Sequence, residues 1–368
     1  MKRLLLLGAG HAQLSVLVAL ARERMPGAEV LLVSPGERLI YSGMVPGLIS
    51  GRYVQDDCSI AVAPLAAAAG AQFIRERAVA LDADGRNVTL SDGRIVEYDL
   101  LSLNTGPSQD RDKIPGARGN ALFVRPIEAF VQLWQRTRRL AEEDDDLDVV
   151  VIGSGAAGVE LALAMRHALQ FRGTLSVVSD GPLLAGYCDG VRRLAGVALK
   201  RAGVQVLPGR CTAIEASHVV LDSLRVACDA PIVAVGSDAP AWLEGSRLAL
   251  DPSGFVRVGA TLQSANHANV LAAGDVIVRD DHPHPRSGVY AVRAGPLLAN
   301  NLRRLIAGGT PSSYWPQRRS LNLLATGDGA AIASWGDWAY QGRLMGWWKD
   351  RIDRAFIARF RPGYASKK

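Results

Sequence analysis

Four stretches of the chain consist almost entirely of apolar residues and stand out against the more mixed sequence around them. They are Leu4–Leu7, Val30–Val33, Val149–Ile152 and Leu175–Val178. Continuous apolar runs of this length are typical of parallel strands that helices cover on both faces. The first and third runs each precede a glycine-rich turn and a helix-like pattern. The sequence therefore predicts two βαβ units about 145 residues apart.

The turn of the first unit carries two of the three glycines of a dinucleotide-binding fingerprint. Gly8 and Gly10 are followed by Gln13 at the third position, within a helix predicted over residues 8–24. The first glycine makes the tight turn, the second lets the backbone approach a pyrophosphate, and the third allows helix and strand to pack closely. We therefore expect a phosphate site here, with Gln13 displacing the helix slightly outward.

The turn of the second unit has the complete fingerprint. Its glycines are Gly153, Gly155 and Gly158. Free N–H groups and the positive dipole end of the following helix favour a phosphate group. Asp180 stands where such folds place the carboxylate that binds an adenosine ribose. Because a carboxylate repels a 2′-phosphate, the site favours NADH over NADPH, although Arg192 and Arg193 nearby leave NADPH open.

Short alternating segments follow each unit, over residues 77–106 and 209–236, and predict small antiparallel hairpins that end in an apolar strand. The plan indicates an α/β protein with two Rossmann-like dinucleotide-binding domains, the second inserted in the first, and a small C-terminal region. The expected bounds are residues 1–115 and 255–314 for the first domain, 116–254 for the second, and 315–368 for the C-terminal region.

Composition excludes several classes of protein. A hydrophobic content of 48% with 38 glycines is typical of a turn-rich globular protein and not of a disordered one. The four cysteines lie far apart, which argues against a redox disulfide or a zinc cluster and favours a reducing cytoplasm. His282 and His284 alternate with prolines and are interpreted as solvated, so no metal site is predicted. The opening apolar run ends at glycines without a cleavage site, and export is not expected.

Positive charge gathers at the end of the chain. The net charge of +6 arises within residues 341–368, and the remainder is balanced, so a nucleic-acid surface over the body is not expected. A predicted helix there has apolar residues every four positions and arginines mostly opposite. The apolar set is Leu344, Met345, Trp348, Ile352, Phe356 and Phe360. Such a helix suits either an anionic membrane surface or packing on the protein's own body or a second subunit.

Five motifs carry a resemblance to a known family. They are "YDLLSLNTG", "VLAAGDV", "YSGMVPG", "HPRSGVYAVRAGPLLANNL" and "YWPQRRSLNLLATGDGAAIASWG". Together with the two glycine-rich turns they resemble the pyridine nucleotide-disulfide oxidoreductase superfamily, whose members bind FAD and a nicotinamide dinucleotide. Within it the chain most resembles the flavoprotein module found alone or fused to selenide, water dikinase. That group is similar to type II NADH dehydrogenases and sulfide:quinone oxidoreductases, and the likeness covers residues 2–361.

The resemblance implies an FAD site in the first domain. The residues implied at the pyrophosphate and adenosine are Gly8, Gly10, His11, Ser34 and Val79. Those implied near the ribityl chain and the isoalloxazine ring are Ser42, Gly43, Met44, Pro46, Thr105, Gly106, Gly274, Asp275, Arg286, Tyr290 and Ala291. Tyr290 and Ala291 would open a helix whose positive end faces the flavin N1–C2=O edge and stabilises anionic reduced flavin. Arg286 would keep a cation beside the flavin.

On the NADH side the resemblance implies that Glu160 orients the nicotinamide and that Gly236 lies at the end of the closing strand. Val235 replaces the usual threonine before Gly236, and Ala294 replaces a glutamine expected near the flavin. No counterpart of the cysteine pairs of disulfide reductases or sulfide:quinone enzymes is found.

The predicted function is that of an FAD-dependent NAD(P)H dehydrogenase, in which hydride passes from NADH to flavin N5 and two electrons then reach a quinone-type acceptor. Three alternatives stay open: a reductase of a protein or selenium-related acceptor, an NADH-binding redox sensor with little turnover, and a flavoprotein that no longer uses NADH. The expected location is cytoplasmic, with peripheral contact to the inner membrane face through the tail as an alternative. Monomer and homodimer are both compatible with the sequence.

Overall fold

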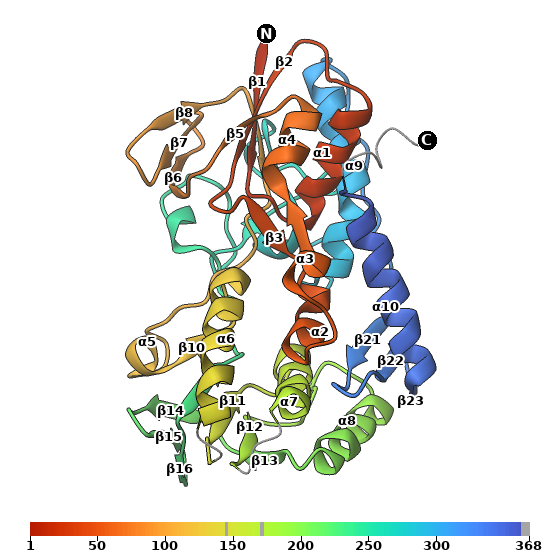
Figure 1. Cartoon of the computed structure of the whole chain (residues 1–368). Helices are drawn as coiled ribbons and strands as arrows, with labels where there is room; N and C mark the ends of the chain where they lie inside the picture. Colours follow the sequence, from red (N-terminus) through yellow and green to blue (C-terminus); the bar gives the residue numbers. More distant parts are fainter. Residues whose placement is uncertain (144–145, 170–172, 362–368) are drawn as a thin grey trace.

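Two five-stranded parallel sheets lie at opposite ends of the molecule (Figure 1). The structure is a computed structural model that describes residues 1–143, 146–169 and 173–361. The strand orders are β19-β9-β1-β2-β5 and β10-β17-β11-β12-β13. The chain leaves the first sheet after β9 and returns to it at β19, after all strands of the second sheet. The predicted class, α/β with two Rossmann-like units, is confirmed.

The first sheet is built from the predicted apolar runs, and the side chains from Leu4 to Leu7 are almost completely buried. Its strands are β1 (Lys2–Leu7), β2 (Ala28–Val33), β5 (Gln72–Ile74), β9 (Leu100–Leu103) and β19 (Val270–Ala272). Helix α1 (His11–Arg22) packs against α9 (Gly288–Ile306) and α4 (Val62–Ala69). Between β2 and α4 lie β3 (Arg38–Ile40), α2 (Val45–Ile49), α3 (Gln55–Cys58) and β4 (Ser59–Ala61).

The second sheet repeats this plan. Its strands are β10 (Leu122–Phe123), β11 (Val149–Ile152), β12 (Leu175–Ser179), β13 (Gln205–Pro208) and β17 (Ala230–Val233). The helices of this half are α5 (Ala117–Asn120), α6 (Ile127–Glu143), α7 (Ala156–Ala168) and α8 (Asp189–Arg201). All pairings in both large sheets are parallel, so their carboxyl ends share one edge in each case.

The two predicted hairpin inserts are three-stranded antiparallel sheets. They consist of β6 (Ala78–Asp82), β7 (Asn87–Leu90) and β8 (Ile95–Glu97), and of β14 (Cys211–Ile214), β15 (His218–Leu221) and β16 (Arg225–Ala227). A two-stranded sheet joins β18 (Val256–Arg257) to β20 (Ile277–Val278). The C-terminal sheet contains β21 (Asn322–Ala325), β22 (Ala331–Trp335) and β23 (Trp338–Gly342), and α10 (Arg343–Ala358) follows it.

The predicted C-terminal helix exists as α10, which runs along one side of the molecule between the two sheets (Figure 1). The apolar residues predicted for this helix do not all lie in the same environment. Phe356 is buried, whereas Leu344, Trp348 and Ile352 are 63%, 40% and 42% exposed. A four-residue step overshoots one helical turn by about 40°, so the stripe rotates from the solvent side to the body along the helix. Lys367 and Lys368 lie outside the described residues.

Candidate functional site

The first glycine-rich turn connects β1 to α1 and packs directly against Asn104. Gly8 has a φ of +88°, and a Cβ on it would lie 2.5 Å from the carbonyl oxygen of Asn104. A Cβ on Gly10 would lie 2.4 Å from Asn104 Oδ1. Neither position has room for a side chain, and Gly8 also needs the left-handed backbone that glycine adopts without strain.

Asn104 follows β9 and fixes the start of α1. Its Oδ1 accepts hydrogen bonds from the backbone N–H groups of Ala12 at 3.0 Å and Gln13 at 3.1 Å. Its Nδ2 donates to the carbonyl of Ala273, 2.6 Å away, at the end of β19. One buried side chain therefore joins three neighbouring chain segments. Sequence reasoning missed it, and the signal was a polar residue directly before the Thr-Gly pair at the end of a buried strand.

A cavity of about 1390 Å³ opens at this turn and follows the carboxyl edge of the first sheet. This volume exceeds the ~300–1,000 Å³ typical of small-ligand sites, and the edge is where open α/β sheets bind nucleotides. The cavity brings together most of the residues predicted for FAD. They are Gly8, Gly10, His11, Ser34, Ser42, Thr105, Gly106, Gly274, Asp275, Arg286 and Ala291.

Two buried polar atoms at this cavity have no hydrogen-bond partner among the described residues: Asp275 Oδ1 and Thr105 Oγ1. The other carboxylate oxygen of Asp275 lies 4.0 Å from the Arg125 guanidinium. Burial raises the pKa of Asp275, while Arg125 and Arg286 act in the opposite direction. A buried polar atom without a partner is costly, so these two atoms fit a ligand that carries hydroxyl groups, as the ribityl chain of FAD does.

The start of α9 faces the same cavity. Ala291 and Arg286 line its wall, and the Arg286 guanidinium lies 3.7 Å from the centre of the Phe255 ring. Tyr290 is buried in a second, much smaller cavity shared with Asp275. Its ring stacks on His284 with the ring centres 4.5 Å apart. The structure thus brings Arg286 and Ala291 to the large cavity but places the Tyr290 ring behind it.

His11 opens α1 at the cavity wall and contacts aromatic rings from two other segments. Tyr41 and Phe356 lie edge-on to it, with ring centres 5.4 Å and 5.7 Å away. Burial, and the positive charge of Arg125, lower the pKa of His11 to about 4. The imidazole is therefore neutral at physiological pH and donates or accepts hydrogen bonds without adding charge.

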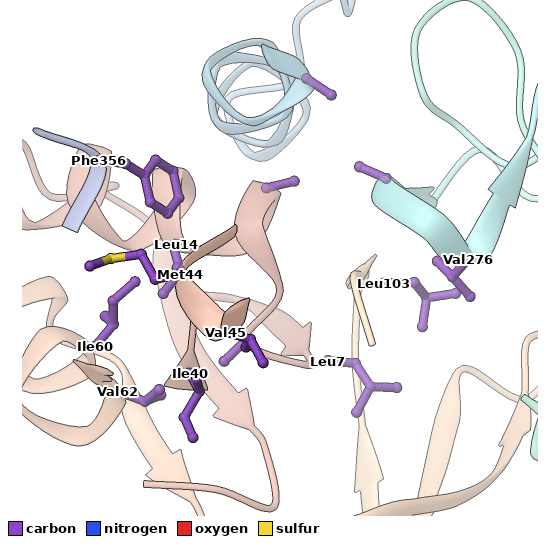
Figure 2. Close-up of a cluster of buried hydrophobic side chains, with 14 of the residues drawn as sticks. Leu7, Leu14, Ile40, Met44, Val45, Ile60, Val62, Leu103, Val276 and Phe356 are labelled. Carbon is purple, nitrogen blue, oxygen red and sulfur yellow. The ribbon is translucent and has the colours of Figure 1, made fainter. Parts of the chain in front are cut away.

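The segment from Ser42 to Pro46 divides between three environments. Ser42 lines the large cavity, whereas Gly43 and Pro46 line a separate space of about 30 Å³. Met44 is fully buried in an apolar cluster that includes Phe356 (Figure 2). The expectation that Met44 borders a flavin ring therefore finds no support in its placement, because its side chain points into the hydrophobic core.

A buried charge network lies behind this segment. Lys349 Nζ donates to the carbonyl of Gly43 at 2.6 Å and to Asp353 Oδ2 at 2.8 Å. Glu160 on α7 accepts the backbone N–H of Ala325 at 2.7 Å. Burial raises the pKa of Glu160 to about 7, although the positive charge of Lys349 opposes the shift. Sequence reasoning missed Lys349 and Asp353, because apolar periodicity along a helix does not register a buried pair of opposite charges.

Val79 lies on β6 with a side chain that is 47% exposed. Its neighbour Ala78 lines the large cavity, and Val79 does not. The pairing register of β6 with β7 shifts between Ala78 and Ala80, and at this irregularity Ala78 lines the cavity while the Val79 side chain is exposed. The expectation for Val79 concerned its backbone and stays a prediction.

The second glycine-rich turn connects β11 to α7 and does not line the large cavity. Gly153 has a φ of +121°, and a Cβ on Gly158 would lie 1.8 Å from the carbonyl oxygen of Gly153. A Cβ on Gly155, the N-cap of α7, would meet nothing within 4 Å. The turn therefore has the close helix contact and the open space that a phosphate group needs.

Asp180 and Gly236 lie beside the second turn at the ends of β12 and β17. The Asp180 carboxylate is 3.2 Å from Nε of Arg210. Gly236 has a φ of +85° and follows Val235, whose carbonyl accepts a hydrogen bond from Gln109 at 2.6 Å. The structure thus gathers the predicted nicotinamide-dinucleotide residues at one sheet edge, apart from Glu160, which lies farther along α7.

The cysteines, the metal-ligating side chains and the helix lengths bear on other possible chemistries of the described part of the chain. Each of the four cysteines is a free thiol. Across the described ranges, no group of three or more histidine, cysteine, aspartate or glutamate side chains is arranged to hold a metal ion. No described helix is both long enough and apolar enough to cross a bilayer.

Comparison with known proteins identifies a family, one relative by sequence and two similar solved structures. Residues 2–295 match the family described as pyridine nucleotide-disulphide oxidoreductases. A demethylphylloquinone reductase of Synechocystis sp. is 25% identical over 287 residues, covering 74% of this chain and 71% of that protein. The sulfide:quinone oxidoreductase structure of Aquifex aeolicus has a TM-score of 0.82 at 19% identity, covering 100% and 93% of the two chains. An NDH2 structure from Plasmodium falciparum in complex with NADH has a TM-score of 0.81 at 13% identity, covering 99% of each.

Proposed function

Because the chain belongs to the pyridine nucleotide-disulphide oxidoreductase family, we propose that it is an FAD-dependent NAD(P)H dehydrogenase that reduces a quinone-type acceptor. The observation that carries the proposal is the large cavity with its unpartnered Asp275 and Thr105 oxygen atoms, together with a separate, complete phosphate turn at Gly153. One chain thus has two nucleotide sites. In this proposal residues 1–115 and 255–314 hold FAD and residues 116–254 hold NAD(P)H.

In the FAD site, the turn at Gly8 and Gly10 receives the pyrophosphate against the positive end of α1. Asp275 accepts hydroxyl hydrogens of the ribityl chain, and Ser34 bonds the adenosine ribose. Arg125 supplies a cation from the segment before α6, where it already faces Asp275. Bound FAD supplies the chemistry, by taking two electrons as hydride from NAD(P)H and giving two electrons to the acceptor.

In the nicotinamide site, Gly153 and Gly155 approach the pyrophosphate and Asp180 lies at the adenosine ribose. Glu160 lies on α7, where it accepts the Ala325 N–H and where the positive charge of Lys349 acts on its carboxyl group. With a pKa of about 7, its carboxyl group holds a proton on Oε at slightly acidic pH and releases it at slightly basic pH. It can therefore orient the nicotinamide amide and exchange a proton near the acceptor.

A quinone-type acceptor is supported by two relatives whose names state quinone chemistry, the demethylphylloquinone reductase and the sulfide:quinone oxidoreductase. The four free cysteines form no disulfide that could relay electrons instead. We further propose that the outer face of α10 and the β22–β23 hairpin rest on the inner face of an anionic membrane. Their exposed aromatic and aliphatic residues are Trp335, Trp338, Tyr340, Leu344, Trp347, Trp348 and Ile352. Basic residues beside tryptophans suit such an interface.

The experiment is an anaerobic titration of the purified yellow protein with NADH and with NADPH, followed by mixing with a panel of quinones. We expect rapid bleaching of the flavin by NADH and rapid reoxidation by at least one quinone. Flavin that is reduced but not reoxidised by any quinone would overturn the proposed quinone-type acceptor. Flavin that neither nucleotide reduces would overturn the proposed dehydrogenase activity. Flotation with vesicles containing anionic lipid tests the membrane contact, and Trp347→Ser with Trp348→Ser is expected to weaken it.

A further inference from the structure

The carboxylate at the nicotinamide-dinucleotide ribose position is not free in this protein. Asp180 forms an ion pair with Arg210, whose Nε lies 3.2 Å from Asp180 Oδ2. Both side chains remain largely exposed, at 65% and 72%, so a ligand can reach them. The sequence suggested Arg192 and Arg193 as nearby cations, and the structure shows the Arg192 guanidinium bonded to Asp189 on the first turn of α8.

Three chain segments converge to hold this pair beside the second phosphate turn. Ser179 Oγ donates to Ser154 Oγ, 2.6 Å away, which joins the end of β12 to the turn itself. The backbone N–H of Gly209 donates to the carbonyl of Ser179 at 3.1 Å. The backbone N–H of Arg210 is in turn fixed by Asp222 Oδ2 at 2.8 Å. The guanidinium is therefore presented from a backbone that hydrogen bonds anchor next to the turn.

This arrangement changes the electrostatics of the ribose position. An isolated carboxylate there accepts ribose hydroxyl hydrogens and repels a 2′-phosphate. Here a guanidinium neutralises the carboxylate, and its fork of N–H groups matches a phosphate in a bidentate manner. An exposed ion pair contributes little free energy, so Arg210 can leave the Asp180 carboxylate and bind a phosphate dianion at little energetic cost.

We propose that Arg210 is the specificity-determining residue for the 2′-phosphate, and that the Asp180–Arg210 pair lets the protein accept NADPH as well as NADH. The proposal rests on the function proposed above for the second turn. When NADH binds, Asp180 accepts the ribose hydroxyls while Arg210 stays beside it. When NADPH binds, Arg210 turns from Asp180 to the 2′-phosphate.

The first test measures binding to the holoenzyme without redox chemistry. Calorimetry compares adenosine 2′,5′-bisphosphate with adenosine 5′-monophosphate, which differ only in the 2′-phosphate. We expect Arg210→Ala to weaken binding of the bisphosphate about tenfold or more relative to binding of the monophosphate, since one charge-assisted contact is lost. Asp180→Ala is expected to strengthen binding of the bisphosphate. The matched control is Arg225→Ala, which removes an exposed arginine paired with Glu215 on the neighbouring small sheet and is expected to change neither ligand.

The second test follows flavin reduction by NADH and NADPH in the same variants. The ratio of kcat/KM for NADPH over NADH is expected to fall about tenfold in Arg210→Ala and to recover partly in Arg210→Lys. A ratio within twofold of the unsubstituted protein in Arg210→Ala, with unchanged bisphosphate binding, overturns the assignment of Arg210. If neither nucleotide reduces the flavin although the adenosine phosphates bind, the proposed dehydrogenase function fails while the adenosine subsite stands.

Discussion

The two nucleotide turns differ at the second and third positions of the glycine fingerprint: the second position is crowded only in the first turn, and the third is crowded only in the second turn. A Cβ on Gly10 would lie 2.4 Å from Asn104, but a Cβ on the equivalent Gly155 would meet nothing within 4 Å. At the third fingerprint position the first turn has the room and the second does not. The first turn accommodates the complete, buried side chain of Gln13, whereas a Cβ on Gly158 would lie 1.8 Å from the carbonyl oxygen of Gly153.

The difference follows from one residue in each closing strand. Asn104, directly after β9, caps α1 from the strand next to β1, and its equivalent directly after β17 is Ala234, which has no polar side chain. Helix α1 is thus held by side-chain hydrogen bonds, and α7 by direct backbone contact. A missing fingerprint glycine therefore does not mean a missing nucleotide site, because a neighbouring strand can supply the fixation that close packing supplies elsewhere.

Gly158→Val gives the largest expected effect, because it inserts a branched side chain where even a Cβ overlaps the backbone. Overpacking of this kind forces α7 away from the turn. A displacement of about 1 Å can cost on the order of a hundredfold in rate, so we expect FAD reduction by NADH to slow by about that factor. Stopped-flow absorbance measures it, and FAD content is expected to remain normal because the first cavity is untouched.

The control for this variant is Gly196→Ala on α8, where a Cβ would meet nothing within 4 Å. We expect wild-type reduction rates there. A Gly158→Val protein that reduces its flavin at the normal rate would show that α7 has room for a side chain, and the contrast between the two turns would disappear.

Asn104→Ala has the next largest expected effect, this time in the first turn. The substitution leaves two buried N–H groups of α1 without an acceptor, at a cost of about 1–3 kcal/mol each if they stay unsatisfied. We expect a lower Tm and FAD binding weakened about tenfold, measured by calorimetry and by fluorescence of released flavin. Asn322→Ala, which loses only local bonds to Ser320, is the control. Equal losses in both variants would contradict a special role for Asn104.

The sequence predicted the two βαβ units because their signal is local: an apolar run, a glycine turn and a helical pattern follow each other directly. The same holds for the two hairpin inserts. Asn104 was missed because its role depends on a residue about 90 positions away that only the parallel pairing of β1 and β9 brings close. No local pattern records such a pairing.

The C-terminal helix α10 also depends on contacts with distant residues that its own sequence pattern does not reveal. Its apolar residues predicted a helix correctly, yet the face that meets the body follows from where β21–β23 place it. Lys349 and Asp353 are charged and received no role from the sequence, but both are largely buried against the Ser42–Pro46 segment. Paired burial of opposite charges removes the usual reason for exposure, and sequence periodicity does not register the pairing.

A third prediction concerns how stability depends on pH, and it compares Glu160 in α7 with Ser15 in α1. Each lies two residues after the third fingerprint position, which is Gly158 in α7 and Gln13 in α1. The folded protein holds the pKa of Glu160 at about 7, above its ordinary value of 4.5. Between these pH values the unfolded chain loses the proton and the folded chain keeps it, so stability falls as pH rises from about 4.5 to 7. We expect Glu160→Gln to remove about 2 kcal/mol of this pH-dependent decrease in the free energy of unfolding, allowing for partial solvent screening.

Denaturant unfolding at pH 5 and pH 8 measures this difference. The Glu160→Gln protein should gain stability relative to wild type at pH 8 and gain little at pH 5. Ser15→Ala changes the equivalent position of the first unit, which does not titrate in this range, and should shift both values equally. A Glu160→Gln protein whose stability difference from wild type is the same at both pH values would contradict the raised pKa.

The smallest expected effect concerns Gln13 itself. Ser102 Oγ donates to Gln13 Oε1 at 2.9 Å, and Gln13 Nε2 donates to the Ser102 carbonyl at 3.3 Å, both buried. Gln13→Leu alone leaves the Ser102 hydroxyl without its acceptor and should cost about 1 kcal/mol, as should Ser102→Ala alone. The double variant removes both partners and should cost less than the sum of the two. A double-mutant cycle by denaturant unfolding measures this coupling. Strict additivity would mean that Gln13 merely fills space between α1 and β9, and Asn104 alone would then hold the helix at its turn.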